Sequence, residues 1–200
     1  MSGPDLLVLH ALRCVGTAGL TRLAATTGLT EPNVESELID LAVAGLTTRD
    51  ADFGVWSLTG AGRAADVKRI TDELESAAAR PAVTAAYDGF LVLNPELLDL
   101  CTAWQLRPAD GVVIANDHRD PSYDARVLDR FADFHRRAAV VCAELSAALS
   151  RFGRYHVRLT EALDRTRAGK LEELADSTSS YHAIWAELHE DLLATLGIPR

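Results

Sequence analysis

The longest amphipathic pattern in the chain covers residues 124–152. Large apolar side chains recur there every three or four residues, among them Phe131, Phe134, Leu145 and Leu149. This spacing places them on one face of an α-helix, and such a face is stable only when other apolar surface covers it. The chain is therefore expected to build a helical core around this segment.

Other helical segments lie on both sides of that stretch, separated by glycine and proline. They are expected at residues 64–79, 83–93, 95–105 and 154–167, with a last helix from about 171 to 196. Asn94 and Pro95 are typical of an N-cap and a first-turn proline, so they are expected to separate two helices. Short connections favour antiparallel neighbours. Residues 67–200 are therefore predicted to form an antiparallel helical bundle for dimerisation or effector binding, with 67–80 as a linking helix.

Residues 107–123 form the one long irregular stretch that the pattern predicts. Pro108, Gly111 and Pro121 interrupt it, and the apolar run at 112–114 is expected to be a short strand or a buried plug. Long loops without regular structure are often functional.

The first 66 residues follow a different plan. Helices are expected at residues 6–15, 21–27 and 31–44, followed by strands at 47–49 and 55–58 around a turn. Asp5 is the expected N-cap of the first helix, and Thr30 is that of the third, with Pro32 in its first turn. The buried stripe expected on the third helix consists of Val34, Leu38 and Leu41, with Ile39 beside them.

Two groups of residues in this region share the spacing of a known family. The first is Gly28-Leu29-Thr30, then Val34, then Ala44-Gly45-Leu46. The second is Trp56-Ser57-Leu58-Thr59-Gly60-Ala61-Gly62-Arg63. Together they resemble the winged helix-turn-helix domain of MarR-type bacterial transcription regulators. The resemblance implies a mainly α fold, with a winged helix-turn-helix and a small β-hairpin over residues 1–66, ahead of the helical bundle.

The resemblance also implies a one-component transcription regulator that forms a homodimer and binds double-stranded DNA. In this family the third helix enters the major groove, while the second helix and the hairpin contact phosphates. By position, the side chains that would contact DNA are Arg22, Thr30, Asn33, Ser36, Glu37, Arg49 and Arg63.

The charge distribution departs from this pattern. Residues 1–65 hold four basic and seven acidic side chains, a net charge of -3, and no lysine or arginine lies between Arg22 and Arg49. The third helix instead carries Glu31, Glu35, Glu37 and Asp40. Because neutralised phosphates supply most non-specific DNA affinity, an alternative stays open. In that alternative the winged helix does not bind DNA and serves as a protein-interaction module or adaptor.

Aromatic and histidine side chains in the second half are the candidates for an effector pocket between helices. They are Tyr87, Phe90, Trp104, His135, His182 and Trp185. The alternative is that most of them are core residues. His135, His182 and His189 could also converge on a metal ion, but no His-x-x-x-His or Glu-x-x-His signature accompanies them. No metal and no cofactor are therefore expected.

Three cysteines, Cys14, Cys101 and Cys142, lie far apart in apolar helical stretches and are expected to be buried free thiols. Asp117 and His118 suggest acid–base chemistry, but no nucleophile motif, phosphate loop or dinucleotide fingerprint accompanies them, so no enzyme is expected. The chain starts without the basic segment of a secretory signal, and no apolar run approaches the roughly 20 residues that span a membrane. We therefore expect a cytoplasmic protein without a membrane partner.

Overall fold

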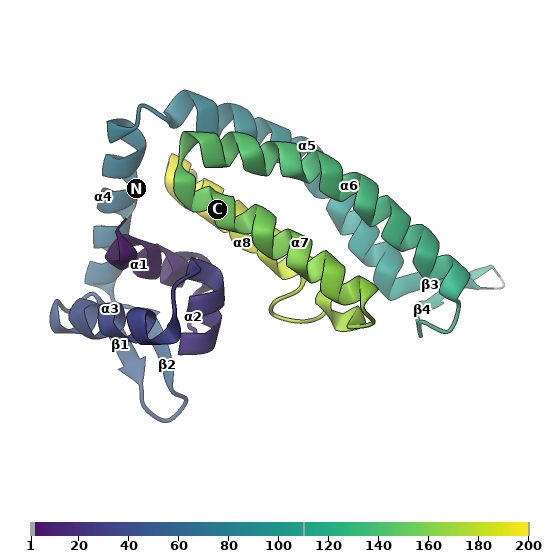
Figure 1. Ribbon diagram of the computed structural model, residues 1–200, viewed down its shortest axis with the longest axis horizontal. Coiled ribbons are helices and arrows are strands. Elements are labelled where there is room, and N and C mark those ends of the chain that lie inside the picture. The colour runs from purple at the N-terminus through teal and green to yellow at the C-terminus, as the bar shows by residue number, and fades with distance from the viewer. Residues whose placement is uncertain (1–2, 110, 200) are drawn as a thin grey trace.

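The computed structural model describes residues 3–109 and 111–199. Eight α-helices dominate this part of the chain, together with two antiparallel hairpins of two strands each. Figure 1 shows the N-terminal helices and the first hairpin at one end, with the C-terminal helices extending away from them. The expectation of a mainly helical fold with a small hairpin is confirmed. Among the described helices, none combines the length and the apolar character needed to cross a membrane.

The N-terminal elements surround a small apolar core. They are α1 (Pro4–Val15), α2 (Leu20–Thr27), α3 (Glu31–Val43), β1 (Thr47–Asp50) and β2 (Val55–Leu58). Leu9 of α1, Leu38 of α3 and Trp56 of β2 are buried in this core. The hairpin is antiparallel, with Thr47 opposite Leu58.

Local sequence explains most of these boundaries. Thr30 caps α3 as expected, because its side chain accepts a hydrogen bond from the backbone N–H of Asn33 at 3.4 Å. Gly28 ends α2 in the left-handed conformation with φ of 77°, which glycine adopts at little cost. The expectation for α1 was wrong: Gly3 is the N-cap and Asp5 lies inside the first turn, because Pro4 fits the first helical position.

Helix α4 (Gly60–Ser76) begins four residues before the start expected from the sequence. Thr59 is its N-cap and accepts from the N–H of Gly62 at 3.0 Å. The expected domain boundary at residue 66 therefore falls inside one continuous helix. This helix is more than a linker, since it packs against α1 and the C-terminal helix, with Asp66, Ile70 and Leu74 buried.

The remaining helices share a second and larger apolar core. They are α5 (Arg80–Gln105), α6 (Pro121–Ala148), α7 (Gly153–Arg167) and α8 (Tyr181–Leu196). Phe90 of α5 stacks on Trp185 of α8 with ring centroids 4.5 Å apart, and Phe134 of α6 meets the same indole edge-on at 5.3 Å. Three of the four helices thus meet at one indole.

Asn94 and Pro95 do not separate two helices, as the sequence pattern had predicted. Helix α5 continues through them, with Pro95 inside the helix. The side chain of Asn94 accepts a hydrogen bond from the indole N–H of Trp185 at 3.0 Å, so it makes a tertiary contact where an N-cap was expected. Packing along α6 and α8 outweighs the local helix-breaking signal.

The segment expected to be irregular contains a second hairpin, β3 (Leu106–Ala109) and β4 (Val112–Ala115), with Leu106 opposite Ala115. A short strand at residues 112–114 is confirmed, but the alternative of a buried plug is wrong. Val112 and Val113 are exposed.

Two further boundaries differ from the expected ones. The long helix ends at Ala148, and a 3-10 turn, η1 (Ser150–Phe152), follows it. The last helix begins only at Tyr181, because η2 (Leu171–Glu173) and an irregular segment precede it. Leu174 is nevertheless buried in the core, so the apolar stripe was real although the helix was not continuous.

Candidate functional site

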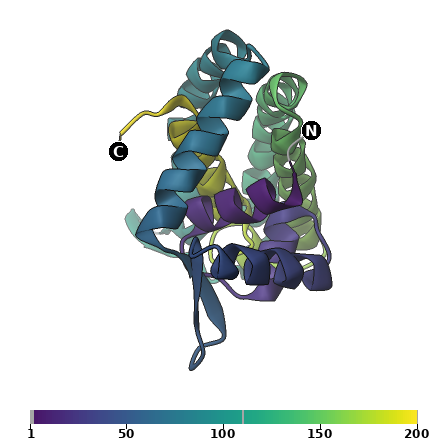
Figure 2. The same ribbon diagram turned by 90° about the vertical axis from the view of Figure 1, so that its left-hand side faces the viewer.

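The outer face of α3 is the surface that the sequence singled out for DNA contact. Thr30, Asn33 and Ser36 are exposed there, and Glu37 is half-buried. Figure 2 shows α3 at the surface beside the β1–β2 hairpin, whose tip projects away from the helices. These side chains are therefore accessible to a partner.

This face is strongly acidic. Glu31, Glu35 and Asp40 are exposed along α3. Partial burial raises the pKa of Glu37, and the negative charges of Asp5 and Asp40 add to the effect. Glu37 thus lies among other negative charges. A phosphate backbone would be repelled by the same charges.

Apolar side chains lie among these acids. Ile39 was expected beside the buried stripe, but its side chain is 50% exposed, and Val43 one turn later is 85% exposed. Residues four apart on a helix are neighbours on its surface. The outer side of α3 thus combines carboxylates with two adjacent apolar groups.

Arg22 is the basic residue of α2 that was expected to contact phosphate. Its Nη2 donates to one carboxylate oxygen of Glu187 on α8 at 3.1 Å, and Arg158 of α7 donates to the other oxygen at 2.6 Å. Glu187 is 4% exposed. Arg22 therefore connects α2 to the C-terminal helices, and its charge is largely compensated inside the protein.

Arg49 and Arg63 remain exposed. The guanidinium of Arg49 lies 5.9 Å from the ring centroid of Trp56 across the hairpin. Arg63 borders a cavity of about 370 Å³ together with Arg13 of α1 and Glu190 of α8. These two arginines are the candidates for a basic contact that still face solvent.

The six expected effector-pocket residues lie in different parts of the C-terminal helices. Phe90 and Trp185 are stacked in the core, with Tyr87 stacked beside Phe90 at 6.3 Å. Trp104 is fully buried elsewhere, where its N–H donates to the carbonyl of Leu171 at 3.3 Å and its ring lies 4.6 Å from that of His118. The aromatic members thus contribute to the core.

The histidines expected near this pocket have separate surroundings. The Nδ1 of His135 lies 3.1 Å from the hydroxyl of Tyr181, and its ring stacks on that of His156 at 5.6 Å. Burial lowers the pKa of His135, and the nearby His156 lowers it further. His182 is half-buried, while His189 stacks on Phe90 at 5.1 Å. Each of His135 and His189 therefore has its own aromatic partners.

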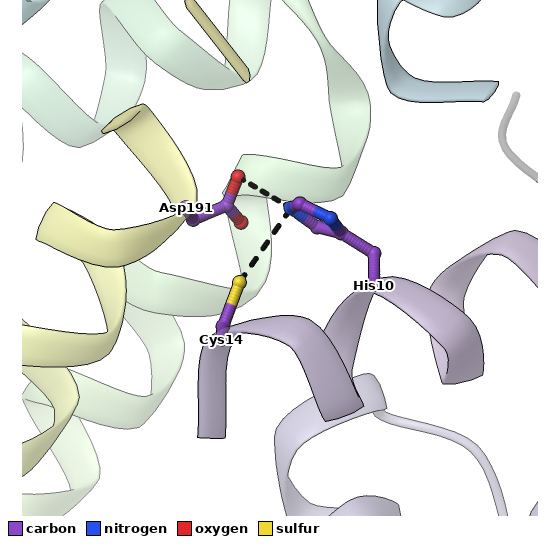
Figure 3. Close-up of side chains that lie close together, drawn as sticks. All are labelled: His10, Cys14 and Asp191. Carbon is purple, nitrogen blue, oxygen red and sulfur yellow. Dashed lines mark hydrogen bonds and ion pairs between the residues drawn. The ribbon is translucent and has the colours of Figure 1, made fainter. Parts of the chain in front are cut away.

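Sequence reasoning missed a cluster of buried ionisable groups that we call the buried ionic cluster: His10, Cys14, Asp66, Arg151 and Asp191. The Nδ1 of His10 lies 3.0 Å from Asp66, and its Nε2 lies 3.0 Å from Asp191. The thiol of Cys14 is 3.6 Å from the same Nε2. Figure 3 shows the side chains of His10, Cys14 and Asp191 directed toward one another. The cluster joins α1, α4, η1 and α8.

The charges in this cluster compensate one another. Asp191 accepts hydrogen bonds from Arg151, from the hydroxyl of Tyr155 at 2.9 Å and from that of Thr195 at 3.0 Å. The Nε of Arg151 also donates to Glu73 of α4 at 2.8 Å. Burial alone would raise the pKa of Asp191, but Arg151 and His10 outweigh it and hold this pKa well below its ordinary value.

Each ring nitrogen of His10 faces a carboxylate oxygen, an arrangement that favours a proton on both nitrogens. Burial alone would lower the pKa of His10. The charge interactions with Cys14 and then with Asp191 outweigh burial and raise this pKa well above its ordinary value. His10 is therefore an imidazolium held between Asp66 and Asp191.

Donor atoms of His10, Cys14 and Asp191 lie within 4.8 Å of one another, a grouping that could hold a metal ion. The surroundings favour a network of ion pairs over a metal centre. The oxygens of Asp191 already accept hydrogen bonds from several donors, and the guanidiniums of Arg151 and Arg154 contact the same carboxylate. Burial raises the pKa of Cys14, which disfavours the thiolate form that a metal ion would bind. Two adjacent cations oppose a divalent ion, so the cluster fits a network of ion pairs better than a metal centre.

Comparison of the chain with protein-family models, with curated proteins and with solved structures finds no match.

Proposed function

We propose that this chain is a protein-interaction module in which an N-terminal winged helix binds the basic surface of a partner protein. The observation that carries the proposal is the acidic, partly apolar outer face of α3, formed by Glu31, Glu35, Ile39, Asp40 and Val43. The C-terminal helices, proposed to form an antiparallel bundle, hold this winged helix in a fixed orientation.

Electrostatics argue against DNA as the ligand of α3. B-DNA carries one negative charge for each ~1.7 Å of its axis, and binding depends on replacing its counterions with basic side chains. Helix α3 has no basic side chain to offer, and Arg22 is paired with the buried Glu187. Approach of α3 to the major groove would set its carboxylates against phosphates.

A protein partner suits the same face. Interfaces between proteins have an apolar centre with polar and charged groups around it. Ile39 and Val43 provide adjacent exposed apolar groups, and Glu35 and Asp40 lie close to them in the sequence of α3. A partner surface with lysine or arginine around an apolar patch would complement both features.

DNA binding by a homodimeric regulator is the second candidate. Thr30, Asn33 and Ser36 are uncharged, polar and exposed on α3, and Arg49 and Arg63 face solvent. A glutamate such as Glu37 can accept a hydrogen bond from cytosine N4. For DNA binding, the two protomers of a dimer would have to supply enough arginines to offset the negative charge of the carboxylates on α3.

Site-specific photo-crosslinking separates the two candidates. A photoreactive amino acid replaces Ile39 in one protein and Val157 of α7 in a matched control, since the two side chains are 50% and 54% exposed. The partner crosslinked only through position 39 is then purified and titrated against the wild type and the Glu35→Lys/Asp40→Lys variant. We expect the double substitution to weaken binding at least tenfold, with affinity falling as salt rises.

The same proteins are tested on DNA. Selection from random duplexes at low and at physiological salt is expected to give no enriched sequence. Enrichment of a sequence bound at least ~10³-fold tighter than random DNA would replace the proposal with the regulator function. Equal binding of the purified partner by wild type and double variant would also overturn it.

A further inference from the structure

A cavity of about 490 Å³ separates α2 from α7 and the beginning of α8. Among its lining residues are Arg22, Ala25 and Thr26 of α2, and Arg158, Glu161 and Arg165 of α7. This volume lies within the range of roughly 300–1,000 Å³ that is typical of small-molecule sites. The cavity is distinct from the outer face of α3 and from the aromatic side chains expected to bind an effector.

Three arginines line this cavity, although the whole chain has a net charge of -9. Three guanidiniums border it against the single carboxylate of Glu161. Arg22 and Arg158 share Glu187, and Arg165 donates to Glu173 at 2.9 Å. Arg22 and Arg158 are thus held in place by a carboxylate that leaves one guanidinium nitrogen of each without a partner among the described residues, while Arg165 also lies near Glu161 at 3.8 Å.

Three lining residues carry buried donors without a hydrogen-bond partner within the described structure. These donors are the Nε of Arg22, the Oγ1 of Thr26 and the Nη1 of Arg158. Thr26 is 0% exposed. A buried donor without an acceptor is destabilising, so it is unusual for several of them to border one cavity. Acceptor atoms of a ligand would satisfy them.

We propose that the cavity binds a small molecule through an oxyanion group, either a carboxylate or a phosphate. Guanidiniums recognise both groups through paired N–H donors, and the hydroxyl of Thr26 can add a further donor. Ala25 and Ile184 supply apolar surface for the body of the ligand. Such a ligand bridges α2 and α7 and therefore stabilises the docking of the N-terminal elements on the C-terminal helices.

This site is independent of the partner that α3 binds, because none of its residues belongs to α3. If α3 proves to bind no protein partner, the anion site can still exist. If the cavity binds no anion, the protein-partner proposal is unaffected.

Titration calorimetry at constant ionic strength tests the site with three probes: orthophosphate, succinate and the neutral isostere succinamide. We expect saturable binding of orthophosphate or succinate up to tens of millimolar, a rise in the thermal midpoint with the same anion, and no response to succinamide. Response to phosphate alone identifies a phosphorylated ligand, and response to succinate alone identifies a carboxylate ligand.

Variants then locate the binding. Ala25→Trp fills the cavity from an exposed position of α2, and Ala143→Trp makes the same change at an exposed position of α6. The first is expected to weaken the anion at least tenfold and the second less than twofold, with Arg165→Gln weakening it at least fivefold. Absence of saturable binding by both anions overturns the proposal, and so does equal affinity in the two tryptophan variants.

Discussion

A ring nitrogen of His10 lies 3.0 Å from a carboxylate oxygen of Asp191, which is 181 positions further along the chain. Both side chains are buried, and they join α1 to α8. Together with Arg151 and Glu73 they form a continuous set of ion pairs between the N-terminal elements and the C-terminal helices. The two parts are therefore expected to unfold together.

Asp191→Asn should lower the free energy of unfolding by about 3–5 kcal/mol, because it leaves buried cations without their shared anion. Urea denaturation measures the effect. Asp72→Asn is the matched control, since Asp72 makes an exposed pair with Lys68, and it should cost less than ~1 kcal/mol. Similar losses of unfolding free energy in Asp191→Asn and Asp72→Asn would mean that the buried ionic cluster stabilises the fold no more than an exposed ion pair does.

The imidazolium of His10 should make stability depend on pH. Its pKa is raised in the folded protein, so its contribution is complete below the unfolded value of 6.5 and is lost as pH rises through the folded pKa. Asp66, Asp191, Cys14 and Arg151 are the ionisable groups around it. The free energy of unfolding of wild type minus that of His10→Gln should shrink as pH increases above neutrality. Urea titrations at several pH values measure it, and a constant difference would contradict a charged His10.

Arg22→Gln should affect folding and leave DNA binding unchanged. Arg22 is one of two arginines on the buried Glu187, and it is partly exposed, so we expect a loss of about 0.5–1 kcal/mol. If the wild type binds DNA non-specifically, the salt dependence of that binding should be the same in Arg22→Gln. Arg49→Gln serves as the comparison, because Arg49 is exposed on the hairpin. A salt slope reduced by about one in Arg22→Gln would show instead that Arg22 contacts phosphate.

Gly62→Ala should destabilise the connection between the first hairpin and α4. A Cβ at this position would lie 1.9 Å from the backbone oxygen of Leu46, so either the hairpin or the helix must shift. We expect a loss of about 1–3 kcal/mol in chemical denaturation. Gly60→Ala, two residues earlier with no atom within 4 Å of the new Cβ, should be neutral or stabilising. Equal effects of the two substitutions would rule out the close contact as the cause.

Much of the fold could be predicted because its signals are local. Thr30 and Gly28 mark the ends of neighbouring helices by their own backbone preferences, and the strand at Val55–Leu58 follows from its β-prone residues. The local signal failed where tertiary packing was stronger. Pro95 lies inside a continuous helix, and Leu174 belongs to the apolar core without belonging to α8.

The buried ionic cluster had only a weak trace in the sequence: a histidine within the apolar run Val8–Leu12, whose other members are buried hydrophobics. Nothing local indicated that Asp66 and Asp191 would lie on either side of it. Arg22 is a second case. Its position on α2 suggested phosphate contact, but in the structure it donates to Glu187, which is 165 positions further along the chain.

The amino-acid order by itself determined where α2, α3 and α7 begin and end to within about one residue, which faces are apolar, and that α3 is acidic. These properties depend on residues within a few positions of one another, so they can be recognised along the chain. Only the tertiary structure decided which charges pair, which arginines remain free, and where a cavity lies between α2 and α7. Those properties depend on distances between helices remote in sequence, and the packing of the whole molecule sets such distances.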